Sequence, residues 1–292
     1  MLAPVFLLSV LLVLLSRSLQ AKLRLLISIN PALTFLAPAL LTSVFFATAT
    51  YYACLTWRLM ALVLVYTFVP AVCVYSQIKR GQTTPASWTD LAVILTLWLP
   101  LEFSAGASLV PRPVQGVLHA TAYGIAVTLG VVLFRLARRW HGMRYGLPRS
   151  FSDLWNVLLG YAISVLLLIP LGLWVGFLAH PHLPRISLRT AAFRIFLIFF
   201  GTALPEEVLF RALIQNWFTQ RIQRQWKAIV LGGVIFGASH LNNAPGPLPN
   251  WRYMAVATIA GLIFGTVFLR STSVFASTTV HAAVNATKYL FF

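Results

Sequence analysis

Acidic residues are scarce in this sequence. Its 292 residues include 5 Asp and Glu against 22 Lys and Arg, and charged residues make up 9% of the chain whereas hydrophobic residues make up 59%. A soluble domain needs far more polar surface than this composition supplies, which excludes an ordinary soluble protein. The composition instead predicts an all-α, polytopic membrane helix bundle.

Cysteine is rarer still, and several familiar site motifs are missing. Cys54 and Cys73 both lie within apolar runs, so neither a disulfide framework nor a cysteine-based zinc site is expected. The sequence contains no HExxH motif, no Gly-rich phosphate loop and no internal repeat. The Lys and Arg residues behind the net charge of +17 fall mostly in short clusters between apolar runs, as the positive-inside rule expects. We therefore expect the lipid bilayer, and no nucleic acid, as a partner.

The apolar runs predict about eight to ten transmembrane helices, because a bilayer core needs about 20 apolar residues per helix. The N-terminus is expected outside, and the location expected for this multi-pass protein is the bacterial inner (cell) membrane. Residues 1–134 are expected to be N-terminal transmembrane scaffold spans, and residues 135–153 a basic cytoplasmic linker. Residues 154–292 carry the polar residues that point to function.

The most unusual stretch is residues 201–218, which read GTALPEEVLFRALIQNWF. Glu206 and Glu207 lie side by side within an apolar run, and Arg211 follows Glu207 at i+4. An ionisable side chain at hydrocarbon depth is costly, so these three need partners, a water-filled cavity or a function.

Two later segments add histidines at helical spacing. Phe236 and His240, in IFGASHLNN, share a helix face at i and i+4, and His281 and Asn285, in VHAAVNAT, do the same on the last predicted span. With a rise of about 1.5 Å per residue, Glu206 and these polar residues lie ~17 to 23 Å from the predicted inner ends of their helices. Because these polar residues lie at a similar depth in the membrane on three predicted spans, we expect them to form one polar layer.

Such a layer contains what peptide hydrolysis by an activated water requires. A carboxylate partly excluded from water, such as Glu206, and a neutral histidine, such as His240, can take a proton from water and pass it to a leaving amine. His281 and an amide such as Asn285 can donate hydrogen bonds to the oxyanion of a tetrahedral intermediate. No serine or cysteine nucleophile is needed.

The same residues resemble a known family. EEVLFR fits EExxxR, FGASH fits FxxxH and HAAVN fits HxxxN, in the order found in the CAAX prenyl protease and bacteriocin-processing (CPBP, or Abi) intramembrane proteases, which include the type II CAAX prenyl endopeptidases. The resemblance covers residues 154–292. It implies an endopeptidase in which Glu206 and His240 activate water while His281 and Asn285 stabilise the oxyanion.

The resemblance also implies roles for the remaining motif residues and a class of substrate. Glu207 would assist catalysis or hold Arg211, and both Arg211 and Phe236 would support the site structurally. The substrate would be a peptide or protein, either lipidated or membrane-anchored, such as a CAAX-like tail, a bacteriocin leader or a sorting tail.

The resemblance leaves the metal question open, because the family is described both as glutamate-dependent and as metal-dependent. Glu206, His240 and His281 form a sufficient zinc ligand set with a position left for water. They come from three helices, however, and HExxH is absent, so the metal-free mechanism is favoured, with a divalent metal such as zinc as the alternative cofactor.

Two functions from other classes compete with the protease. A non-proteolytic immunity or scaffold protein would keep the polar layer for structure or for binding a partner. A transporter or channel would use the intramembrane carboxylates as an ion path, but its halves would be expected to contain matching broken helices, which the sequence lacks.

Overall fold

The computed structural model describes residues 2–82, 86–184, 186–243 and 247–292. This part of the chain is all-helical, with 79% helix and no strand, which confirms the predicted all-α fold. The chain divides into two compact units, Met1–Gly142 and Met143–Phe292. We call them unit 1 and unit 2. The division falls inside the segment 135–153, and the helical structure of unit 1 continues to Ala137.

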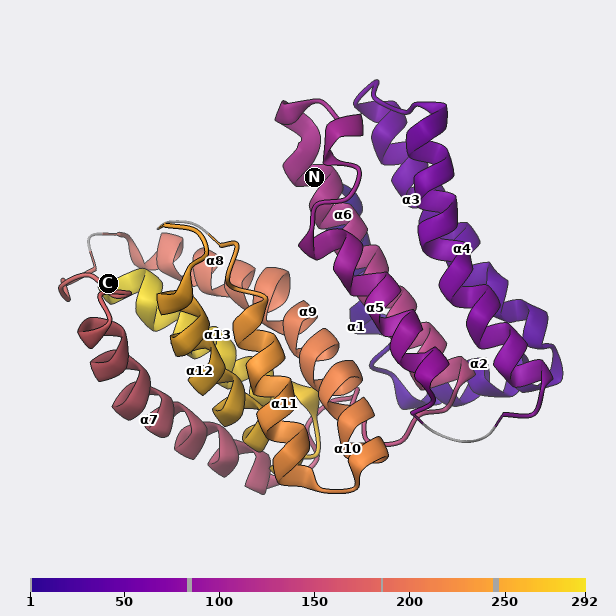
Figure 1. The fold of residues 1–292 in the computed structure, drawn as a ribbon. Coiled ribbons are helices and arrows are strands. Elements are labelled where there is room, and N and C mark those ends of the chain that lie inside the picture. Colours follow the sequence, from indigo (N-terminus) through magenta and orange to yellow (C-terminus); the bar gives the residue numbers. More distant parts are fainter. Residues whose placement is uncertain (1, 83–85, 185, 244–246) are drawn as a thin grey trace. The chain divides into compact units, whose positions relative to one another are not determined.

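The longer helices of unit 1 run side by side, and shorter helices precede them at the N-terminal end of the chain (Figure 1). The helices are α1 (Leu2–Val13), α2 (Arg17–Ile29), α3 (Leu36–Tyr51), α4 (Trp57–Lys79), α5 (Trp88–Glu102) and α6 (Arg112–Gly130), with short helices η1 (Pro31–Phe35) and η2 (Ala107–Leu109) and the π-helical extension η3 (Val131–Ala137). α1 and α2 meet at 90°. Ser16 begins the new helix by accepting a hydrogen bond from the Leu19 N–H, which satisfies one of the free donors of its first turn.

The number of membrane-crossing helices is lower than the eight to ten expected from sequence. Five helices in the described residues are long and apolar enough to cross a membrane, or up to six if the bent α1–α2 pair counts as one span. The main reason is length, since α5 has 15 residues and α11 (Gln225–Ala238) has 14. The apolar run that contains Asn30 still gives one candidate span, which begins at Pro31 after the extended Asn30.

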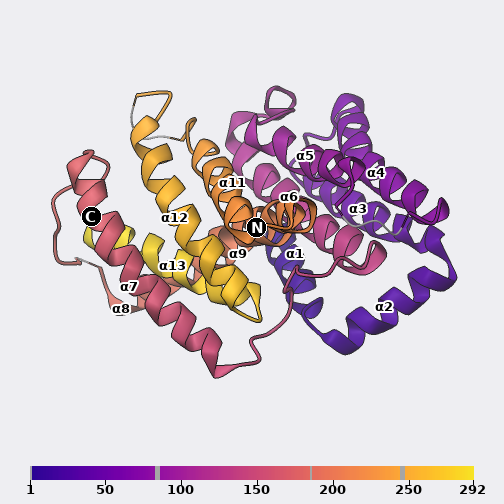
Figure 2. The ribbon, with the colours of Figure 1, turned by 60° about the horizontal axis from the view of Figure 1, so that its bottom comes forward.

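Unit 2 is built around two central helices (Figures 1 and 2). α12 (Trp251–Arg270) and α13 (Val274–Phe291) lie between α7 (Phe151–Trp174) and a continuous helical run over residues 188–222. That run consists of α8 (Leu188–Ile198), η4 (Phe199–Ala203), α9 (Leu204–Glu207), η5 (Val208–Gln215) and α10 (Asn216–Ile222). The glutamate pair therefore lies in a helix that α13 packs against.

The hydrogen-bond pattern changes on both sides of the glutamate pair. The segments η4 and η5 are π-helical, and they flank the four-residue helix α9, which contains Pro205, Glu206 and Glu207. Proline has no N–H to donate, and its ring displaces the carbonyl four residues earlier, so a wider turn ahead of Pro205 is physically reasonable. Isolated π turns are rare and are found frequently at functional sites.

The beginning of unit 2 is fastened to the turn between α12 and α13. Asp153 accepts hydrogen bonds from the backbone N–H and from the hydroxyl of Thr272. The Thr272 nitrogen lies 2.7 Å from the Asp153 carboxylate oxygen. Arg144 donates to the carbonyls of Leu269, at 3.2 Å, and Ser271. Burial lowers the pKa of the Arg144 guanidinium, an effect that the nearby Asp153 carboxylate opposes. These bonds fix the start of α13, the helix that carries two of the predicted site residues.

Close backbone contact between α11 and α12 brings a third segment to the site. A Cβ atom at Gly261 would lie 2.9 Å from the Gly233 Cα and 3.2 Å from the Phe236 ring, so a larger residue would force the helices apart. Because both positions are glycine, α11 approaches α12 closely enough to place Phe236 and His240 at the centre of unit 2.

Candidate functional site

The two adjacent glutamates have different surroundings. Glu207 is fully buried, and its Oε2 lies 3.3 Å from Nε of Arg211, whose side chain is also fully buried. The Glu206 side chain keeps 21% of its surface exposed and lines a cavity within unit 2. Successive side chains on a helix point about 100° apart, which is why one carboxylate turns into the protein and the other toward the cavity.

His281, on α13, lies between the two carboxylates. Its Nδ1 is 3.1 Å from Oε1 of Glu207, and its Nε2 is 3.8 Å from Oε2 of Glu206. An ionised carboxylate only accepts hydrogen bonds, so with Glu207 ionised beside Arg211 the Nδ1–H of His281 is the donor. The Nε2 atom is then the one that faces Glu206.

His240, at the end of α11, is held by its own helix. Its Nδ1 lies 2.8 Å from the carbonyl oxygen of Phe236, one turn earlier. A carbonyl cannot donate, so the Nδ1–H must, and in the neutral ring Nε2 carries the free lone pair. His240 is 8% exposed and lines the same cavity as Glu206. A histidine with this tautomer can act as a base toward a molecule in the cavity.

The ring of Phe236 lies against both histidines of the site and against Arg211. Its ring centroid lies 4.8 Å from that of His240 and 5.6 Å from that of His281. The guanidinium carbon of Arg211 lies 4.7 Å from the same centroid. Phe264, on α12, stacks on His281, with the two ring centroids 4.8 Å apart and 21° between the ring planes. Aromatic packing therefore limits the movement of both imidazoles.

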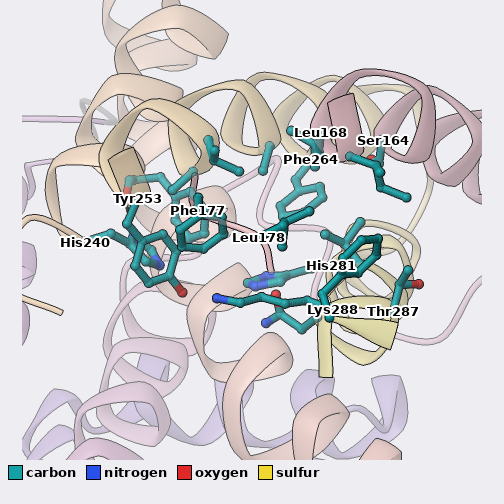
Figure 3. A pocket seen from close by; sticks show the side chains of 18 of the residues that line it. Ser164, Leu168, Phe177, Leu178, His240, Tyr253, Phe264, His281, Thr287 and Lys288 are labelled. Carbon is teal, nitrogen blue, oxygen red and sulfur yellow. Dashed lines mark hydrogen bonds between the residues drawn. The ribbon is translucent and has the colours of Figure 1, made fainter. Parts of the chain in front are cut away.

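The cavity has a volume of about 250 Å³. Glu206, His240, His281 and Asn285 all line it, so the structure brings these four sequence-predicted residues to one space. Figure 3 shows the His240 and His281 rings directed into it from different helices. Glu207 is not among the lining residues and lies behind His281, where it holds the ring through Nδ1.

Most residues that line the cavity were not predicted from the sequence, among them Tyr253, Phe264 and Lys288. The Tyr253 ring centroid is 4.4 Å from that of His240. Lys288 belongs to α13 and points its amino group into the cavity (Figure 3). A signal was present in the sequence, because Lys288 follows Asn285 at i+3 and so shares its helix face.

The three residues of the alternative zinc ligand set, Glu206, His240 and His281, all line the cavity. In the described ranges, His, Cys, Asp and Glu side chains make no group of three or more that could hold a metal ion. His281 uses Nδ1 for Glu207, its Nε2 is 3.8 Å from Glu206, and the ring of Phe236 contacts both imidazoles.

One family comparison gives a match. Residues 188–287, about a third of the chain, match the family model described as "Rce1-like: Type II CAAX prenyl endopeptidase Rce1-like". This confirms the resemblance over the segment that contains every motif residue, and it supports a protease. With the five candidate spans, it identifies an integral, multi-pass membrane protein. Comparison with curated proteins and with solved structures gave no match.

Proposed function

We propose that this chain, Rce1-like over residues 188–287, is an integral membrane endopeptidase that hydrolyses a peptide bond at a cavity inside its helix bundle. The observation that carries the proposal is that Glu206, His240, His281 and Asn285, from three separate helical segments, all line one cavity. The proposed setting is the bacterial inner membrane. The proposed substrate is a lipidated or membrane-anchored peptide, since such a peptide can reach a cavity within the bilayer.

Glu206 and His240 activate the water in this proposal. The Glu206 carboxylate and the free Nε2 lone pair of His240 face the cavity, and either can accept a proton from a water held there. The hydroxide that forms attacks the carbonyl carbon of the scissile bond and gives a tetrahedral intermediate. The proton then passes to the leaving nitrogen as the C–N bond breaks, which releases an amine and a carboxylate. No step of this glutamate-dependent mechanism uses a metal ion.

His281 and Asn285 stabilise the oxyanion. The Asn285 amide can donate one hydrogen bond, and His281 can donate another through Nε2 when both of its ring nitrogens are protonated. In that form the positive charge lies between Glu206 and Glu207. Glu207 acts through His281 by holding Nδ1, and Arg211 keeps Glu207 in place, so both are positioning residues.

Replacing Glu206 tests the proposal. The variants Glu206→Ala and Glu206→Gln are reconstituted in vesicles with a mixture of N-terminally acylated peptides, and cleavage products are measured by mass spectrometry. We expect kcat to fall by about 10³-fold or more, because the general base is lost. Helix content and thermal unfolding should stay close to those of the wild type, because Glu206 is partly exposed to the cavity.

The matched control removes a carboxylate from unit 1. Glu102 is partly buried and accepts a hydrogen bond from the Trp98 indole at 3.1 Å, so Glu102→Gln changes the charge without touching the cavity. It should cleave like the wild type. Full cleavage by Glu206→Ala would contradict the mechanism proposed here, whereas absence of cleavage by the wild type would favour a non-proteolytic immunity or scaffold protein instead.

A further inference from the structure

Three arginines of unit 1 lie close together. The Oε1 atom of Gln20 is 3.3 Å from Nη2 of Arg24 and 3.0 Å from Nε of Arg135, so one neutral oxygen accepts from both guanidiniums. The Nη2 atom of Arg139 donates to the carbonyl of Arg24 at 3.4 Å. The two nitrogens that share the Gln20 oxygen are within about 6 Å of each other, a distance at which like charges repel. We call Arg24, Arg135 and Arg139 the arginine cluster.

The carboxylates of unit 1 do not neutralise the arginine cluster. The sequence of this unit has two acidic residues, Asp90 and Glu102. Asp90 pairs with Arg138, and Glu102 accepts a hydrogen bond from the Trp98 indole. In the part of the chain that the structure describes, no arginine of the cluster makes an ion pair. The positive charge of the cluster is therefore available to an anion from outside unit 1.

The hydrogen-bond donors of the cluster indicate what kind of anion fits. A guanidinium has five N–H donors in one plane. Protein acceptors in the described ranges take two of them at Arg24, two at Arg135 and one at Arg139. A phosphate diester has two non-bridging oxygens that share its negative charge, and the forked donors of arginine match them in spacing. The chemistry of the cluster therefore favours a phosphate group.

The helix that carries Arg24 has the properties of a helix at a membrane surface. α1 packs against the candidate span α6, and α2 meets α1 at 90°, so α2 turns out of the direction of these helices and toward the membrane plane (Figure 2). Leu25, Leu26 and Ile29 on α2 are 60%, 49% and 73% exposed. A helix with both cations and exposed apolar side chains is typical of the interface between lipid headgroups and acyl chains.

We propose that the arginine cluster binds the phosphate of an anionic phospholipid whose acyl chains lie against the exposed apolar side chains of α2. Leu25 and Leu26 directly follow Arg24, so the charged and the apolar contacts are adjacent on one helix. The bound phosphate offsets the repulsion between Arg24 and Arg135. The site belongs to unit 1 and does not depend on the peptidase function proposed for unit 2.

The test measures which lipid binds to the purified wild-type protein. Protein in detergent is titrated with phosphatidylglycerol or with phosphatidylcholine of the same acyl chains, and native mass spectrometry gives the Kd for each lipid. Both lipids contain a phosphate diester, but the choline group compensates its charge. We expect phosphatidylglycerol to bind about 10- to 100-fold more tightly, because each arginine near the headgroup favours an anionic lipid by roughly 5-fold.

Single substitutions test whether the preference comes from the cluster. Arg139→Gln removes one charge and one long hydrogen bond from an exposed position, so the fold should be kept. It should weaken phosphatidylglycerol binding about 5-fold and leave phosphatidylcholine binding unchanged. The matched control is Arg80→Gln, which removes the same charge from an exposed position at the end of α4, outside the cluster. It should bind both lipids like the wild type.

A double substitution tests the acyl contact. Leu25→Ser with Ile29→Ser makes two exposed apolar positions polar while keeping the arginines, so both lipids should bind more weakly. Glycerol phosphate, the soluble counterpart of the headgroup, should not displace phosphatidylglycerol from the wild type at millimolar concentration. Circular dichroism confirms that each variant keeps its helix content.

Three results would contradict the proposal. Equal binding of the two lipids by the wild type would remove it, and this comparison needs no variant to fold. An equal loss of phosphatidylglycerol binding in Arg80→Gln would assign the preference to the general positive charge of unit 1. Displacement by glycerol phosphate, or unchanged lipid binding by the double variant, would assign the cluster to a soluble phosphate ester. Peptide cleavage enters none of these measurements, so they stand or fall apart from the peptidase function.

Discussion

The buried charges of the two units are paired in different ways. In unit 1, Asp90 is fully buried and accepts two hydrogen bonds from Arg138, both 3.1 Å long. The same carboxylate accepts from the Ser87 backbone N–H in a capping box at the start of α5. Both partners of this pair belong to the structure of the unit, and neither lines the cavity of unit 2.

In unit 2 the corresponding ion pair supports a side chain that faces a cavity. Glu207 contacts Arg211 with one oxygen and His281 with the other. His281 in turn has its second nitrogen directed at Glu206, which lines the cavity. The comparison shows that a buried ion pair can serve the fold alone or can orient a reactive group. What distinguishes the two cases is whether the network ends at a cavity.

The largest effect is expected from Arg211→Met. The substitution leaves the carboxylate of Glu207 buried without its cation, which should cost about 3 to 5 kcal/mol in the free energy of unfolding. Cleavage should also be lost, because Glu207 no longer holds Nδ1 of His281 in a fixed position. Denaturant unfolding in detergent micelles measures the stability.

A neutral double variant separates the two effects of Arg211→Met. Glu207→Gln with Arg211→Met removes both charges, and the amide oxygen at position 207 can still accept from His281. Most of the lost stability should return. If the double variant were as unstable as the single one, the buried charge would not be the cause.

A smaller effect is expected from Asp90→Asn in unit 1. An asparagine keeps the oxygen that caps α5, but Arg138 loses its counter-charge, so the free energy of unfolding should fall by about 2 to 3 kcal/mol. The fraction that remains folded should cleave peptides at the wild-type rate per molecule. A loss of kcat in folded protein would show that this pair also acts on the site and would break the comparison between the units.

The smallest effect is expected where two helices of unit 1 exchange an uncharged hydrogen bond. The hydroxyls of Thr42 on α3 and Thr67 on α4 lie 2.7 Å apart, and Thr67 is also 2.9 Å from the carbonyl of Val63. Thr42→Val removes the interhelical bond and leaves Thr67 its second partner. The expected loss is about 0.6 kcal/mol, the usual value for such bonds within membranes. A loss of several kcal/mol would show that Thr42 has another role.

Much of the site was predictable because its residue types contradict their surroundings. Glu206, Glu207 and Arg211 are costly in an apolar helix, and the i,i+4 spacing of the histidine motifs puts each pair on one helix face. The Glu207–Arg211 pairing follows from helix geometry within one segment. Local spacing therefore predicted which residues matter and some of the contacts within a helix.

Contacts between helices were harder to predict. Spacing along α13 does not reveal that His281 directs one nitrogen to each glutamate, since this depends on how α13 packs on α9. Lys288 was not recognised as a cavity residue for a similar reason, because its position along α13 does not reveal which side chains of other helices it meets. The bend between α1 and α2 and the shortness of α5 and α11 lowered the number of candidate spans, since hydropathy registers neither a change in helix direction nor the end of a helix.

The amino-acid sequence by itself determined the helical membrane class and the set of polar residues, because the composition and the cost of buried charge act wherever a residue lies in the fold. Tertiary structure decided that Glu206 faces the cavity with His240 and His281 while Glu207 lies behind. It also decided that Lys288 joins them. Those relations depend on the close crossing of α11 and α12 and on the packing of α13, which bring together residues that are far apart in the chain.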